Sequence, residues 1–131
     1  MCGIIGYLGS KNAKDIIIKG LKRLEYRGYD SVGIAVFEDD TINSIKCSGK
    51  VVDLEKEIND NIFQGTVGIG HTRWATHGPP NEINAHPHAS SDNSIYLIHN
   101  GVIENYKVLK EFLLNEGVEF KSDTDSEVLV Q

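Results

Sequence analysis

The spacing of the hydrophobic residues changes between the first two segments of the chain. Residues 3–8 form a short, mostly apolar run that ends at Gly9, which is typical of a buried strand. From Ala13 to Leu24, apolar residues recur at three- and four-residue steps among charged ones, which predicts an amphipathic helix. The chain is therefore expected to begin with a strand, followed by a helix that faces the core.

A hairpin, a second helix and a further strand are predicted next. Residues 32–37 and 42–47 are strand-like runs, and the polar stretch 38–41 between them predicts an antiparallel connection. Residues 51–58 predict a short helix, and residues 66–69 predict a strand interrupted by glycines.

Hydrophobic periodicity is lost between residues 73 and 93. A loop of about 20 residues without secondary structure is uncommon inside a compact domain and is mostly functional. We interpret this segment as a loop that covers a substrate. Residues 95–98 then predict another strand.

The last part of the chain returns to a helical pattern. Asn105 is a good N-cap for a helix that Gly117 ends, and residues 118–120 predict a brief strand. Residues 122–125 open a further helical pattern that stops at Gln131. We interpret the chain as a fragment of a longer protein.

Composition and charge narrow the class of partner. The chain has 131 residues, of which 40% are hydrophobic and 24% charged, as expected for one globular domain. Its net charge of −6, without a cluster of basic residues, argues against nucleic acid or an anionic membrane as a partner. The two cysteines are too few for a disulfide scaffold, and no signal peptide or membrane-spanning run is visible. We expect a soluble, cytoplasmic protein that binds a small molecule.

Cys2 is the first candidate for chemistry. A small second residue allows removal of Met1, which would leave a thiol and an α-amino group on one carbon. These groups titrate near pH ~8.5 and ~8, so the amine can act as base for the thiol. The alternative is that Cys2 is a small apolar residue at the edge of a strand.

Two further pairs fit the hydrolysis of an amide by a thiol. Asn100 and Gly101 follow a predicted strand and could direct a side-chain amide and a backbone N–H at an oxyanion, although Asn-Gly is also a common hairpin turn. Arg73 and Asp125 could hold the two charged ends of an amino acid, although each could be a surface charge, or in the case of Asp125 a first-turn helix residue. Trp74 is either a core residue or a lid that excludes water.

The five histidines do not predict a metal centre. The chain lacks a His-Glu-x-x-His helix and paired cysteines, which are the usual zinc-binding patterns. We expect no metal site and no cofactor.

Five motifs, in this order, resemble the glutaminase domain of the glucosamine-6-phosphate synthase family, the glutamine–fructose-6-phosphate aminotransferases. They span most of the chain: MCGIIG at 1–6, LKRLEYRGYDSVGIA at 21–35, HTRWATHGPPNEINAHPH at 71–88, HNGVIENY at 99–106 and SDTDSEV at 122–128. The resemblance implies an α+β fold, the four-layer αββα sandwich of N-terminal nucleophile hydrolases, here truncated. It also implies that residues 1–131 are the N-terminal portion of a class II glutamine amidotransferase domain, without the sugar isomerase domains.

The resemblance also implies a role for each site residue. Cys2 resembles the nucleophile, Asn100 and Gly101 resemble the oxyanion hole, and Arg27 resembles a support for the nucleophile. The substrate-binding residues implied for glutamine are Arg73, Trp74, Thr76, His77 and Asp125.

The implied reaction is hydrolysis of L-glutamine to L-glutamate and ammonia. In whole members of the family the ammonia converts fructose 6-phosphate into glucosamine 6-phosphate for amino-sugar synthesis, and the enzyme is expected to be a homodimer. Two alternatives stay open: an inactive fragment that only binds glutamine or forms oligomers, and an N-terminal nucleophile hydrolase that acts on another amide. Because strands of the sandwich would be missing, we expect the isolated chain to be poorly stable or to self-associate.

Overall fold

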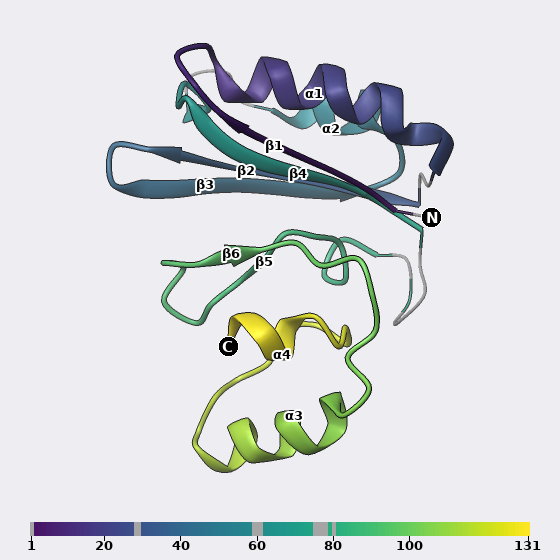
Figure 1. Ribbon diagram of the computed structural model, residues 1–131, viewed down its shortest axis with the longest axis vertical. Helices are drawn as coiled ribbons and strands as arrows, with labels where there is room; N and C mark the ends of the chain where they lie inside the picture. Colours follow the sequence, from purple (N-terminus) through teal and green to yellow (C-terminus); the bar gives the residue numbers. More distant parts are fainter. Residues whose placement is uncertain (1, 28–29, 59–61, 75–78, 80) are drawn as a thin grey trace.

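The computed structural model describes residues 2–27, 30–58, 62–74, 79 and 81–131 (Figure 1). In chain order the elements are β1 (Gly3–Leu8), α1 (Ala13–Leu24), the 3-10 helix η1 (Glu25–Arg27), β2 (Ser31–Glu38), β3 (Thr41–Ser48), α2 (Val51–Glu57), β4 (Val67–Arg73), β5 (His88–Ala89), β6 (Tyr96–Leu97), α3 (Tyr106–Asn115) and α4 (Glu127–Val130).

These elements form four layers in the order helix, sheet, sheet, helix (Figure 1). Helices α1 and α2 cover one face of an antiparallel sheet with strand order β1-β4-β2-β3. The other face of that sheet looks toward the two-stranded sheet β5-β6, beyond which lie α3 and α4. The predicted α+β class with αββα layers is confirmed.

Helix α1 forms because capping, charge and hydrophobic spacing agree. The Asn12 side chain accepts a hydrogen bond from the Asp15 N–H at 3.1 Å, which satisfies one free donor of the first turn. Ile17 and Leu21 are fully buried against the large sheet, and each such side chain contributes about 1.5–3 kcal/mol. This face of α1 fixes the position of β1 and β4.

The register of the large sheet brings the start of β1 to the end of β4. Gly3 pairs with Thr72, and Ser31 of β2 pairs with Arg73. Because side chains alternate across a strand, His71 and Arg73 lie on one face of β4, opposite the face that carries Thr72. Gly33 permits the close approach of the second layer, since a Cβ there would lie 2.0 Å from the His86 carbonyl oxygen.

The second half differs from its predicted elements in three places. Strand β4 continues to Arg73, beyond the predicted end at residue 69, because it is paired on both sides. Residues 118–120 are not a strand, since the described part of the chain offers them no ladder partner. The predicted loop 73–93 contains the short strand β5.

Helix α3 ends as predicted, whereas α4 begins later than predicted. Asn105 precedes α3 but makes no side-chain cap, and Gly117 ends that helix with φ +90°. Residues 122–125 form a polar turn before α4, which begins at Glu127. None of the described helices is long and apolar enough to cross a bilayer.

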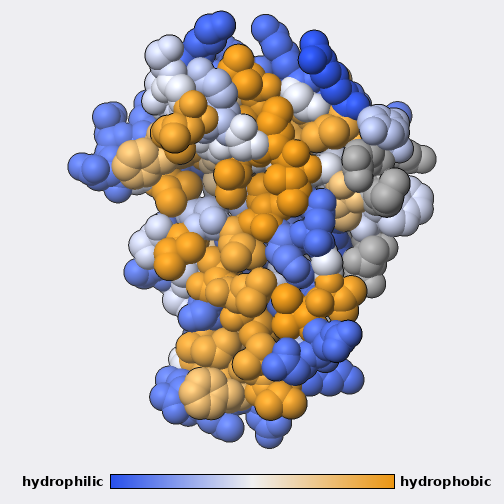
Figure 2. Space-filling model, in the orientation of Figure 1, coloured by the Kyte–Doolittle hydropathy of each residue, from blue (hydrophilic) through white to orange (hydrophobic). Residues whose placement is uncertain are grey.

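Hydrophobic surface extends toward the end of the molecule that carries α3, as Figure 2 shows. No residue of α3 is buried, and Val108 and Phe112 are 68% and 61% exposed. Leu8 at the end of β1 is 82% exposed. These side chains lack the covering layer that an amphipathic helix or a sheet edge normally has.

Candidate active site

Residues from both sheet layers meet at one small pocket. Its walls are the start of β1, the end of β4, the segment after β6 and the turn before α4. The lining residues are Cys2, Arg73, Trp74, His86, His99, Asn100, Gly101, Thr124, Asp125 and Ser126. Six of the predicted site residues therefore lie together, although they are far apart in the sequence.

Cys2 directly precedes β1 and lies beside the end of β4. The Trp74 N–H donates a hydrogen bond to its sulfur at 3.3 Å, and the thiol lies 3.5 Å from the Trp74 carbonyl oxygen. Cys2 is only partly buried, whereas Cys47 is buried in the core. The thiol of Cys2 is thus held at an accessible place by backbone atoms.

Asn100 joins the nucleophile candidate to a buried histidine. Its Nδ2 donates to the Cys2 carbonyl oxygen at 3.3 Å, and its Oδ1 lies 2.7 Å from His71 Nε2. Burial lowers the pKa of His71 to about 4, so the ring is neutral near pH 7. Since an amide oxygen only accepts, the proton of this ring belongs on Nε2. His71 thereby keeps the NH₂ group of Asn100 directed toward Cys2.

His71 belongs to a row of three packed histidines. The ring centroids of His71 and His86 are 4.4 Å apart, and those of His86 and His88 are 4.5 Å apart. Burial lowers the pKa of all three, that of His88 to about 4. His88 Nε2 pairs with Thr124 Oγ1 at 2.8 Å, while both ring nitrogens of His86 lack a hydrogen-bond partner among the described residues. Within that part of the chain, no three His, Cys, Asp or Glu side chains are arranged to hold a metal.

Arg73 and Asp125 place opposite charges on two walls of the pocket. Both side chains are 3% exposed, so the alternative of solvated surface charges is wrong. Arg73 Nη1 donates to the Pro79 carbonyl oxygen at 3.2 Å, and one oxygen of Asp125 accepts from the Ile103 N–H at 2.6 Å. Asp125 precedes α4, so it is not a first-turn residue of that helix. The pair can receive an anionic and a cationic group.

Asn100 and Gly101 are not a hairpin turn, because they lie between β6 and α3. A Cβ at residue 101 would lie 2.9 Å from His99 Nε2, so glycine allows this backbone to pass close to the ring. Trp74 is 50% exposed and is therefore not a core residue.

The pocket is narrow as it stands. It encloses about 30 Å³, which is roughly the room of one water molecule. The half-exposed Trp74 forms part of its wall.

The side chains of three predicted site residues lie outside the described part of the structure. Thr76 and His77 lie outside the described residues. Arg27 ends η1, and its side chain is likewise outside the described part.

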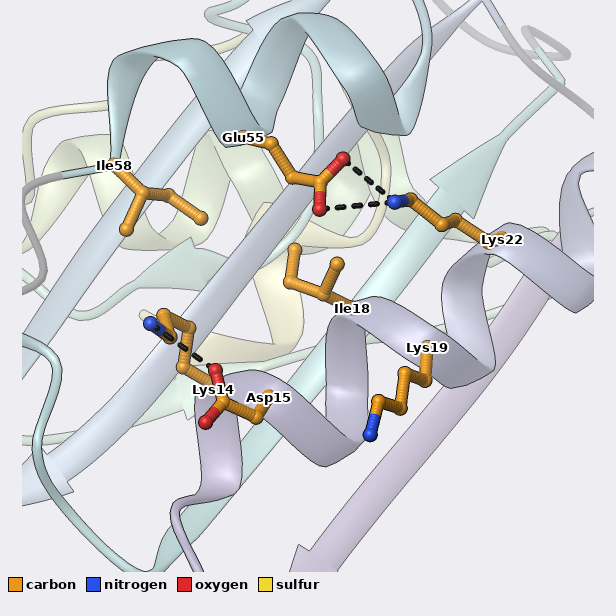
Figure 3. Close-up of a pocket in the computed structure, with 7 residues that line it drawn as sticks. All are labelled: Lys14, Asp15, Ile18, Lys19, Lys22, Glu55 and Ile58. Atoms are coloured by element: carbon orange, nitrogen blue, oxygen red, sulfur yellow. Dashed lines mark hydrogen bonds and ion pairs between the residues drawn. The ribbon is translucent and has the colours of Figure 1, made fainter.

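A larger pocket, of about 400 Å³, lies in the outer helical layer between α1 and α2 (Figure 3). Lys22 pairs with Glu55 across it at 2.8 Å, and Lys14 pairs with Asp15 at 3.1 Å. It contains no nucleophile or histidine, so the smaller pocket at Cys2 is the candidate active site.

Sequence reasoning missed the residues that support the site. The sequence alone assigns no catalytic role to His71, which is one of the five histidines without a metal-binding pattern. His71 lies two residues before Arg73 and shares a face of β4 with it, but this relationship was hidden because the predicted strand ended at residue 69. Asn84, Thr124 and Ser126 lie within two of the five motifs, but nothing in the sequence assigns a role to them.

Proteins of known function resemble this chain along its whole length. The chain is 60% identical over 132 residues to the glutamine–fructose-6-phosphate aminotransferase (isomerizing) of Bacteroides thetaiotaomicron, covering 100% of this chain and 22% of that protein. It is 55% identical over 129 residues to the enzyme of the same name from Clostridium acetobutylicum, covering 98% of this chain and 21% of that protein. The chain thus spans about a fifth of the length of these curated relatives.

Solved structures give the fold. Glutamine phosphoribosylpyrophosphate amidotransferase from B. subtilis, complexed with ADP and GMP, matches with a TM-score of 0.82 and 30% identity, over 98% of this chain and 28% of that one. A structure described as the allosteric regulatory enzyme of purine biosynthesis matches with a TM-score of 0.84 and 30% identity, with the same coverage. The predicted N-terminal nucleophile hydrolase fold is confirmed by this likeness. A sequence profile described as a glutamine amidotransferase domain matches residues 56–131. The chain therefore belongs to the glutamine amidotransferase domain family.

Proposed function

We propose that this chain hydrolyses L-glutamine to L-glutamate and ammonia, with Cys2 as nucleophile after loss of Met1. The observation that carries the proposal is the meeting of the Cys2 thiol, the Asn100 amide and the oppositely charged Arg73 and Asp125 at one pocket. Membership in the glutamine amidotransferase family supports the choice of substrate.

The charged walls orient the substrate. The Arg73 guanidinium binds the α-carboxylate of glutamine, and the Asp125 carboxylate accepts from the α-ammonium. With both ends held, the side-chain amide extends toward Cys2. Trp74 then covers the site, and Thr76 and His77 are proposed to contact the substrate from the same loop.

The reaction proceeds through a thioester. The α-amine of Cys2 takes the thiol proton, and the sulfur attacks the amide carbon. The Asn100 NH₂ group and the Gly101 N–H stabilise the oxyanion, a contribution for which loss of one donor typically costs about 10²–10³ in kcat. The oxyanion collapses, the C–N bond breaks, and ammonia leaves with the proton returned by the amine. Water then hydrolyses the γ-glutamyl thioester to glutamate and frees the thiol.

We further propose that residues 1–131 are the N-terminal portion of a class II glutaminase domain in a longer protein, with Arg27 supporting the nucleophile. In that protein the ammonia would aminate fructose 6-phosphate to glucosamine 6-phosphate at sugar isomerase domains outside this chain. The names of the relatives support this assignment. A cytoplasmic homodimer is part of the same proposal.

A second candidate, an inactive fragment that only binds glutamine or forms oligomers, is favoured by the exposed apolar side chains of α3, such as Val108 and Phe112, which a second copy could cover. Release of glutamate from glutamine, with Cys2→Ala as control, separates the two functions. Turnover that Cys2→Ala abolishes supports hydrolysis, whereas saturable binding without glutamate release supports the binding module.

The nature of the nucleophile is tested by mass spectrometry after treatment with a diazoketone analogue of glutamine. A single adduct on Cys2 of a chain that lacks Met1 is expected. A chain that retains Met1, or an adduct elsewhere, would overturn the mechanism.

A further inference from the structure

Asn84 links two segments beside the active-site pocket through a fully buried side chain. Its Nδ2 donates to the Pro79 carbonyl oxygen at 3.0 Å, and its Oδ1 accepts from the Asp123 N–H at 2.8 Å. The exposed fraction of Asn84 is 0%. Both hydrogen-bonding ends of the amide are therefore used, each on a different segment of the chain.

Each of these contacts lies next to one half of the proposed amino-acid clamp. The Pro79 oxygen that Asn84 contacts also accepts from Arg73 Nη1 at 3.2 Å. Asp123 lies two residues before Asp125 in the same turn. One amide thus connects the guanidinium side of the pocket to its carboxylate side.

The backbone around Asn84 is itself anchored from the large sheet. Lys46 of β3 donates to the carbonyl oxygens of Ile83 and Ala85, at 3.3 and 3.0 Å, on either side of Asn84. The Asn84 N–H donates to Asn81 Oδ1 at 2.9 Å. Such fixed surroundings allow the side chain to hold a distance between the walls, since its own position is set by three further hydrogen bonds.

We infer that Asn84 is a positioning residue that sets the spacing between Arg73 and Asp125, and so the selectivity of the pocket for a free α-amino acid. The inference rests on the proposed function. The α-carboxylate and α-ammonium of an amino acid are attached to one carbon, so they fit only one separation of the two charged groups. A displacement of about 1 Å at such a site can cost about 10²-fold in rate.

The test compares two reagents that react with the same thiol. The diazoketone analogue of glutamine needs the clamp, whereas iodoacetamide, which lacks the two charged ends, needs only an accessible Cys2. We expect Asn84→Ala to slow labelling of Cys2 by the analogue by roughly 10- to 100-fold and to leave labelling by iodoacetamide within about twofold. Peptide mapping separates Cys2 from the buried Cys47.

Asn12→Ala is a matched control. The Asn12 amide also joins two segments, since its Oδ1 accepts from the Asp15 N–H and its Nδ2 donates to the Phe63 carbonyl oxygen. It does not line the pocket at Cys2. Loss of an amide that joins two segments away from the pocket should not affect Cys2. Both the analogue and iodoacetamide should therefore label Cys2 of this variant at unchanged rates.

Asn84→Asp is a second variant for the case in which the alanine variant fails to fold, because it keeps the side-chain volume and the acceptor for Asp123. Its carboxylate cannot donate to the Pro79 carbonyl oxygen and places a negative charge opposite it. Slower labelling by the analogue alone is again expected. Equal loss with both reagents, or no loss with either, would overturn the inference. If the unmodified chain reacts with iodoacetamide but not with the analogue, the proposed function fails, and the inference fails with it.

Discussion

His71 Nε2 lies 2.7 Å from Asn100 Oδ1, and on its other side the same amide donates to the Cys2 carbonyl oxygen. A buried, neutral ring therefore fixes which end of the amide faces Cys2, the proposed nucleophile. Without this contact, rotation of the amide could present its oxygen to the developing oxyanion, which would repel it.

Replacing His71 by Phe should lower kcat for glutamine hydrolysis by about 10- to 100-fold, less than the 10²–10³ expected for Asn100→Ala. His71→Gln should recover part of the loss, because its side-chain NH₂ can donate to Asn100 Oδ1. Steady-state release of glutamate measures both. Equal losses in the Phe and Gln variants would contradict an orienting role.

The histidine row should make stability depend on pH. Burial depresses the pKa of His71 and His88 from 6.5 to about 4. Between these values the unfolded chain binds protons that the folded chain does not, so stability is complete above pH 6.5 and falls as the pH falls toward 4. The loss is of the order of 3 kcal/mol for each group at most.

Thermal unfolding followed by circular dichroism from pH 7.5 to 4 measures this dependence. His71→Gln should flatten the slope, because its side chain does not titrate. A slope that is unchanged in this variant would show that other groups are responsible.

The two cysteines should differ in reactivity. Burial raises the pKa of the Cys47 thiol to about 11, and the side chain lies in the hydrophobic core. Since the thiolate is the reactive form, an alkylating reagent at pH 8 should modify Cys2 in the folded chain and both cysteines in urea. Intact-mass spectrometry counts the adducts. Two adducts without urea would contradict the buried position of Cys47.

Secondary-structure elements that depend on local sequence could be predicted, whereas those that depend on distant partners could not. The strand 3–8 and the helix Ala13–Leu24 were predicted with their observed bounds, because their period and capping are local properties. The length of β4 and the absence of a strand at 118–120 depend on ladder partners elsewhere in the chain, which periodicity does not reveal.

The same distinction applies to the site. Cys2, Arg73, Asn100 and Asp125 could be selected by their chemistry and by the family resemblance. The supporting contacts could not, because His71 and Asn84 act through side-chain hydrogen bonds to residues 29 and 39 positions away. Such pairs become visible only in the folded chain.

The charged walls of the pocket should determine substrate affinity more than turnover. Asp125→Asn keeps an acceptor for the Ile103 N–H but removes the charge that we propose binds the α-ammonium of glutamine. A hydrogen bond to a charged group contributes about 1.5–3 kcal/mol, so KM should rise roughly 10- to 100-fold with a smaller change in kcat. Initial rates over a range of glutamine concentrations give both constants. A loss confined to kcat would mean that Asp125 acts on the reacting amide instead.

The exposed apolar face of α3 should make the isolated chain self-associate. Val108 and Phe112 are four positions apart, so they lie on one side of the helix, and both are more than 60% exposed. Large apolar patches of this kind are normally covered, and two copies can cover them by pairing. Phe112→Glu should shift the chain toward the monomer in sedimentation velocity experiments. Lys107→Glu, which changes the charge of the same helix without removing hydrophobic surface, should leave the distribution unchanged. A monodisperse monomer of the unsubstituted chain would contradict the prediction, because it would show that the exposed apolar face of α3 does not cause association.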